Sequence, residues 1–211
     1  MLGAYNYGFE VCDYHTEIAG TVIDETIQAK NNCRLALLYL AYLCAATAHT
    51  ISLMYAKDNA SYAGSSRNTT SAAALSGQAV INVTTTPRDP AGNAAAASDI
   101  VAYQLTDGTW EFNTIASVAT KAITHNANIT GVDAGAGGTA IAAGAKYLIF
   151  GVVGDGACLK LKATASVQKE FLNYGLPVLV HPYVGEPFYV TIDNGTNAGF
   201  LMNALFGHLD K

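Results

Sequence analysis

The chain has 211 residues, of which 51% are hydrophobic and only 13% are charged, and its net charge is −5 at pH 7. The acidic balance excludes a nucleic-acid surface, which would need clustered lysine and arginine, and the four cysteines include no CxxC pair that would indicate a zinc or redox site. Because typical soluble domains carry about 25% charged residues, the low charge favours a surface covered by other subunits in an assembly, over an ordinary domain with a polar but uncharged surface.

The first thirty residues are predicted to be extended. Tyr5, Tyr7, Phe9 and Val11 alternate with other residues, which gives a strand one apolar edge. We interpret residues 1–30 as an N-terminal arm that adds to the sheet of a neighbouring subunit. Tyr5, Tyr7 and Phe9 would be its interface residues. The alternative is an ordinary edge strand.

The most apolar stretch of the chain is residues 35–48, LALLYLAYLCAATA. Leucine and alanine without glycine or proline predict a helix that is buried nearly all round. The stretch is shorter than the roughly 20 apolar residues that span a membrane, so we expect no membrane contact. The alternating residues 49–55 predict a strand. Residues 57–77 are rich in serine, asparagine and threonine and predict a flexible loop.

Residues 99–114 carry the clearest local signal. Two alternating runs flank Asp107-Gly108, a pair that favours the two-residue type I′ turn of a β-hairpin. A hairpin closed by that turn has one aromatic face, which must pack against another part of the protein. The cross-strand pairs would be Leu105 with Trp110, Tyr103 with Phe112, and Val101 with Thr114.

Short runs of strand composition, separated by Gly, Asn and Asp turns, occupy much of the remaining chain. The segment 200–206 is predicted as a short C-terminal helix. We therefore predict a mainly β fold, an antiparallel sandwich or small barrel of short strands, with one early helix and this second, short one. Residues 31–211 would form a single β-rich domain.

No catalytic motif can be assigned in this sequence. Residues 135–140 match the loose dinucleotide pattern, but no strand and helix flank them as a βαβ unit requires, so a turn is favoured. Glu186, at a turn into a strand, is a candidate acid or base if a histidine meets it in space; otherwise it caps the turn. We predict no enzyme activity, no catalytic residue, no cofactor and no metal.

Several segments together resemble small head-decoration (cement) or related structural proteins of tailed bacteriophages. They are Thr47–Ser52, the hairpin continuing through Thr114–Val118, Gly144–Gly151 and Gly185–Ile192. The resemblance covers about half of the chain. It implies a non-enzymatic virion component, assembled in the host cytoplasm, that binds the major capsid protein or other virion proteins where capsid subunits meet.

The same resemblance implies a homo-oligomer, for which we expect a trimer. We expect no nucleic-acid or membrane partner, because of the acidic charge balance and the short apolar stretch described above. The alternative function is a phage tail or fibre module that recognises a host glycan, with sugar rings stacking on an exposed Trp110. The sequence does not separate a capsid location from a tail location, because both favour a β-rich protein of low charge.

Overall fold

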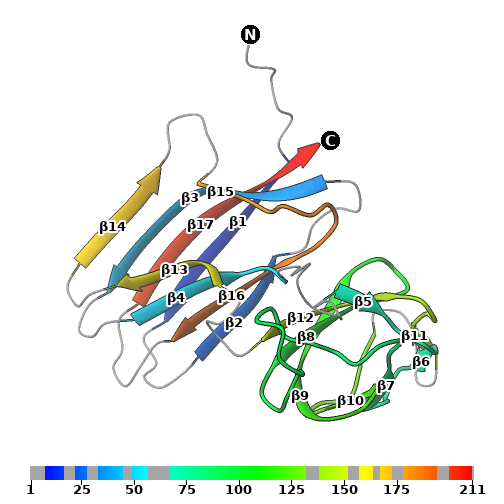
Figure 1. Cartoon of the computed structure of the whole chain (residues 1–211). Coiled ribbons are helices and arrows are strands. Elements are labelled where there is room, and N and C mark those ends of the chain that lie inside the picture. The colour runs from blue at the N-terminus through cyan, green and yellow to red at the C-terminus, as the bar shows by residue number, and fades with distance from the viewer. Residues whose placement is uncertain are drawn as a thin grey trace. The chain divides into compact units, whose positions relative to one another are not determined.

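The structure is a computed structural model, and it describes residues 8–16, 22–27, 33–44, 49–56, 67–131, 138–151, 157–163, 167–172, 178–193 and 200–210. Every regular element in these ranges is a β-strand, and the strands form antiparallel sheets (Figure 1). The prediction of a mainly β, antiparallel protein is confirmed. The two predicted helices are absent from the described ranges.

The chain forms two compact units. The first, here called the split unit, joins Met1–Tyr55 to Cys158–Lys211. The second, the inserted unit, is Ala56–Ala157 and interrupts the first along the chain. This division differs from the predicted boundary at residue 30, because strands from both ends of the chain belong to the same sheets.

The split unit contains two sheets. The first has the strand order β1-β17-β3-β14, and β15 also pairs with β3; the second has the order β13-β4-β16-β2. The first sheet consists of β1 (Gly8–Thr16), β17 (Phe200–Asp210), β3 (Cys33–Cys44), β14 (Val167–Leu172) and β15 (Leu179–Val180). The second consists of β13 (Ala157–Ala163), β4 (His49–Met54), β16 (Phe188–Asp193) and β2 (Val22–Ile27).

The strand order of these two sheets is that of a jelly roll. If the eight main strands are numbered 1 to 8 along the chain, the sheets read 1-8-3-6 and 5-4-7-2. Successive strands pass from one sheet to the other except at the fourth and fifth, which are neighbours in one sheet. Two interlocked Greek keys produce this order. The inserted unit lies between the fourth and fifth strands, β4 and β13.

Aromatic side chains fill the space between the two sheets. The ring of Phe188 on β16 lies 6.0 Å, centroid to centroid, from that of Phe206 on β17. Because these strands belong to different sheets, the sheets face each other. Leu35, Leu37 and Met54 are fully buried in the same unit.

The predicted helix at residues 35–48 is wrong: the stretch lies in β3, and its last four residues are outside the described ranges. β3 has neighbours on both sides: β17 pairs with it on one side, and β14 and β15 pair with it on the other. A bulge at Leu38 shifts the register against β17, so the buried positions move from Leu35 and Leu37 to Leu40. A central strand that is apolar on both faces has the same pattern as a buried helix.

The predicted helix at residues 200–206 is also wrong. The segment is the start of β17, which lies between β1 and β3 in its sheet. Ala204, Phe206 and His208 are buried at every second position, as in the two-residue period of a strand, and Gly207 between the last two is buried as well. A run of seven residues was too short to distinguish that period from a helical one.

The predicted arm contributes edge strands to the split unit. Residues 8–16 form β1, paired with β17, and residues 22–27 form β2, paired with β16 of the same chain. This pairing corresponds to the edge-strand alternative. Of the predicted loop at 57–77, residues 57–66 lie outside the described ranges. The remainder contains two short strands, β5 (Arg67–Thr69) and β6 (Ala74–Leu75), so the loop prediction is wrong there.

The inserted unit is built on a six-stranded sheet of order β5-β12-β8-β9-β10-β7, beside a two-stranded sheet of β11 and β6. Its further strands are β7 (Val80–Asn82), β8 (Ile100–Gln104), β9 (Trp110–Ala119), β10 (Ala122–His125), β11 (Thr139–Ile141) and β12 (Lys146–Gly151).

Backbone hydrogen bonds join the segments that continue its two edge strands. Thr84 N–H donates to the Thr69 carbonyl over 3.0 Å, and Ser71 N–H donates to the Asn82 carbonyl over 2.9 Å. The sheet therefore closes into a small barrel along this line, here called the seam. The barrel has its own apolar interior, which includes Ile81, Val101, Tyr103, Leu105, Ile115, Ile123, Tyr147 and Ile149.

The first and last strands of the inserted unit are neighbours. Arg67 of β5 lies opposite Leu148 of β12. The chain therefore enters and leaves this barrel at one place, which is the geometry that lets a domain be inserted between two strands of another.

The predicted hairpin is present as β8 and β9, but its turn is different. The Leu105 carbonyl accepts the Gly108 N–H over 3.0 Å, and Leu105 N–H donates to the Thr109 carbonyl over 2.8 Å. Gly108 has a φ of +89°. These are the features of a three-residue loop with a glycine bulge, not of a two-residue type I′ turn.

The extra loop residue shifts the hairpin register by one. Gln104 lies opposite Trp110, and Tyr103 lies opposite Glu111 rather than Phe112. Since neighbouring residues of a strand point to opposite faces, the predicted pairing of aromatic residues on one face is wrong. Trp110 is only 5% exposed.

Candidate functional site

The predicted interface residues fall at the beginning of the chain. Tyr5 and Tyr7 lie outside the described residues, and Phe9 lies in β1 opposite Gly207. β1 is an edge strand, which pairs with β17 on one side and with no other described strand. An edge strand presents unpaired backbone donors and acceptors that can pair with a strand of another chain. β1 is therefore a candidate interaction site on the split unit.

The barrel interior holds a buried polar pair. The hydroxyl of Tyr103 and Nε2 of His125 are 2.8 Å apart, and the two side chains are 0% and 4% exposed. The backbone N–H of His125 donates to the Ala79 carbonyl over 2.8 Å. His125 Nδ1 has no hydrogen-bond partner among the described residues.

Burial keeps this pair neutral. Removal from water lowers the pKa of His125 from 6.5 to about 4. The hydrogen bond to the Ala79 backbone and the charge of Glu111 raise this pKa, but by less than burial lowers it. Burial also raises the pKa of Tyr103, with Tyr147 adding to the effect, and raises that of Tyr147 to about 12. Because both side chains are buried and neutral, we assign this pair a structural role.

A second buried histidine lies in the loop between β15 and β16. His181 is 0% exposed, and its Nδ1 accepts the backbone N–H of Tyr183 over 3.0 Å. Its ring lies 4.7 Å from that of Phe188 and 5.3 Å from that of Tyr55. Glu186 follows in the same loop and is also buried, 3% exposed. These surroundings are those of a core histidine.

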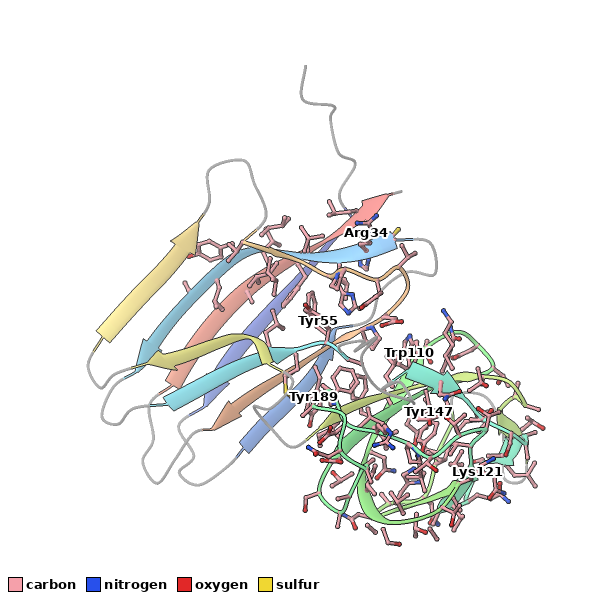
Figure 2. The ribbon with its side chains drawn as sticks, viewed as in Figure 1. Arg34, Tyr55, Trp110, Lys121, Tyr147 and Tyr189 are labelled. Carbon is pink, nitrogen blue, oxygen red and sulfur yellow. The ribbon has the colours of Figure 1, made fainter. Side chains whose placement is uncertain are left out.

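An open cleft of about 570 Å³ lies at the seam of the inserted barrel. Ser71, Asn82, Val83 and Thr84 line it from the seam, and Lys121 from the turn between β9 and β10. Figure 2 shows Lys121 at the outside of the inserted unit, whereas Tyr147 lies within it. No motif predicts this site, because segments far apart in the chain form it.

The described part of the chain shows neither a metal-binding cluster nor a membrane-spanning helix. In those ranges, no three histidine, cysteine, aspartate or glutamate side chains are grouped so that they could hold a metal ion. None of the described residues forms a helix of the length and apolar character needed to cross a bilayer.

Comparisons with known proteins give no family. No family model matches the chain, and no curated protein matches it. A search of solved structures finds a chain from the structure of the infectious bursal disease virus Gx strain, with 10% sequence identity and a TM-score of 0.13. The match covers 98% of this chain and 40% of the viral chain, so this chain spans less than half of that chain's length. A TM-score of this size indicates no common fold.

Proposed function

We propose that this protein is a non-enzymatic structural subunit of a virus particle, and that it decorates the capsid and stabilises contacts between major capsid subunits. The observation that carries the proposal is the jelly-roll strand order of the split unit. Jelly rolls recur in viral capsid proteins, in lectins and in cupins. Because one fold serves several functions, the choice among them depends on further features of the chain.

Two such features favour a role in a particle. The chain carries only 13% charged residues, which suits a surface that meets other subunits. The edge strand β1 follows an N-terminal segment with Tyr5 and Tyr7, so backbone pairing by the strand and anchoring by the aromatic residues would act together. The proposal includes a location in the virion and assembly into a homo-oligomer, for which we propose a trimer.

The test is binding to capsid shells that lack this protein. We expect the full chain to co-sediment with shells of the major capsid protein and to saturate at a fixed ratio. A variant without residues 2–7 should co-sediment less while it keeps the folded split unit, because the deletion leaves β1 (Gly8–Thr16) intact, and circular dichroism checks this. No saturable binding of the full chain would refute the capsid proposal. Equal binding of both forms would refute the role of the N-terminal segment.

Recognition of a host glycan by a tail or fibre protein is the second candidate function. Stacking on Trp110 does not support it, because that side chain is only 5% exposed. The seam cleft offers a different site for such a ligand.

A further inference from the structure

We propose that the seam cleft of the inserted unit binds a carboxylate-bearing saccharide. The site is formed by polar side chains from two parts of the barrel, and these side chains have no hydrogen-bond partner among the described residues. Ser71 and Asn82 come from the seam, and Lys121 comes from the turn between β9 and β10. None of these three side chains makes a hydrogen bond or an ion pair with another residue in the described ranges. This inference does not depend on the protein being a capsid component.

Lys121 provides an uncompensated positive charge at the cleft. No aspartate or glutamate lines the cleft with it. The described carboxylates of the inserted unit accept hydrogen bonds from backbone N–H groups that do not line the cleft. Asp89 accepts the N–H of Asn93, Asp99 that of Ala96, and Asp107 that of Thr109. Glu111 accepts the N–H groups of Thr130 and Gly131. A ligand with one carboxylate would therefore meet a cation that has no partner among the described residues.

The neighbours of Lys121 suit a sugar more than a compact anion. The amide of Asn82 has donors and an acceptor, and the hydroxyl of Ser71 is both donor and acceptor, as sugar hydroxyls require. The alanine methyls at positions 72, 119 and 122 line the cleft and can contact the C–H face of a ring. A phosphate or sulfate ion would favour several cations or backbone N–H groups instead.

The turn that carries Lys121 is held in a strained conformation. Thr120 has a φ of +52°, which is rare for a β-branched residue. The Lys121 carbonyl accepts the Val83 N–H over 2.8 Å, which fixes the turn against the seam. Strained residues are retained preferentially where they position a functional group, and here the turn sets the lysine beside Asn82.

The cleft is open and has no aromatic lining, so a single site should bind weakly, with a dissociation constant of about 1 mM. The experiment is saturation-transfer difference NMR on the full chain with N-acetylneuraminic acid and glucuronic acid. N-acetylglucosamine is the neutral comparison. Sodium sulfate, which has no protons to observe, is added as a competitor of N-acetylneuraminic acid and tests a general anion site. A short polyglutamate peptide tests an acidic protein partner.

Lys121→Gln should weaken binding of the acidic sugars roughly tenfold or more, since it removes a charge-assisted hydrogen bond. Asn82→Asp should weaken it similarly, because it adds a repelling carboxylate. Lys146→Gln is the matched control, since Lys146 is an exposed lysine of the same barrel that does not line the cleft. It should change the affinity less than about twofold.

The proposal is overturned if no acidic sugar binds at millimolar concentration, or if Lys121→Gln and Lys146→Gln bind equally well. It is also overturned if the neutral sugar, sulfate or the peptide binds as well as the acidic sugars. Fluorescence of Trp110, the single tryptophan of the chain, shows that each variant retains the folded barrel.

Discussion

Acidification should weaken the inserted unit through His125. This histidine is neutral in the barrel interior, where burial lowers its pKa from 6.5 to about 4. Above about pH 6.5 it is neutral in both the folded and the unfolded chain. As the pH falls from 6.5 towards 4, the unfolded chain takes up a proton that the folded chain does not. The free energy of unfolding therefore falls through this range and levels off below about pH 4.

The size of the effect follows from the difference between the two pKa values. One pKa unit corresponds to about 1.4 kcal/mol, so we expect a loss of about 2–3 kcal/mol between pH 7 and pH 4 from this residue. The assay is urea unfolding followed by the fluorescence of Trp110. Since this is the only tryptophan and lies in β9, its signal reports the inserted unit.

The matched variant is His125→Gln, which keeps an amide near the Tyr103 hydroxyl but does not titrate. All other ionisable groups are the same in both proteins, so the difference between their pH profiles isolates His125. We expect the profile of the variant to be flatter by about 2–3 kcal/mol over the same range. Identical profiles for the two proteins would show that His125 is not held neutral in the folded barrel.

Four further changes test the fold and the turns. Gly108→Ala should destabilise the inserted unit by about 1–2 kcal/mol in the Trp110 assay, because Gly108 has a φ of +89°; no loss would contradict the glycine-bulge loop. Thr120→Gly should stabilise the same unit by up to about 1 kcal/mol by relieving the strain at φ +52°, and a lower stability would argue against that strain. Phe188→Ala should cost about 3–5 kcal/mol, seen as a lower melting temperature by circular dichroism, because the ring is fully buried between two sheets; a loss below about 1 kcal/mol would contradict that packing. Replacing residues 67–151 by a short Gly-Ser linker should leave a split unit that melts cooperatively, whereas an unfolded product would show that the jelly roll depends on its insertion.

The local β character of the chain could be predicted because alternation is a local property. The hairpin at 99–114 was found from two alternating runs around Asp107-Gly108. Its register could not be predicted, because a two-residue turn and a three-residue loop with a glycine bulge fit the same dipeptide. The structure adopts the longer loop, in which only Gly108 needs a positive φ.

The two helix errors have a common cause. β3 and β17 are central strands with apolar residues on both faces, so their sequences lack the alternation that identifies a half-buried strand. Their partners lie far away in the chain: Gly8 of β1 pairs with His208 of β17. Such pairings decide both the strand state and the jelly-roll order, and no local pattern contains them.

The candidate sites depend on the same distant contacts. In the seam cleft, residues 82–84 lie beside residues 119, 121 and 122 because β7 pairs with β10, and residues 71 and 72 join them when the barrel closes. The Tyr103–His125 pair likewise joins β8 to β10. The histidines are scattered along the sequence, so their spacing does not indicate the pair, whereas the strand pattern around His181 favours the core position that it has.

The native mass of the purified full chain tests the proposed structural role most directly. Light scattering over a wide concentration series should give a mass of three chains that does not fall on dilution, as expected for a self-assembling subunit of a symmetric particle. A monomer at every concentration would contradict the account.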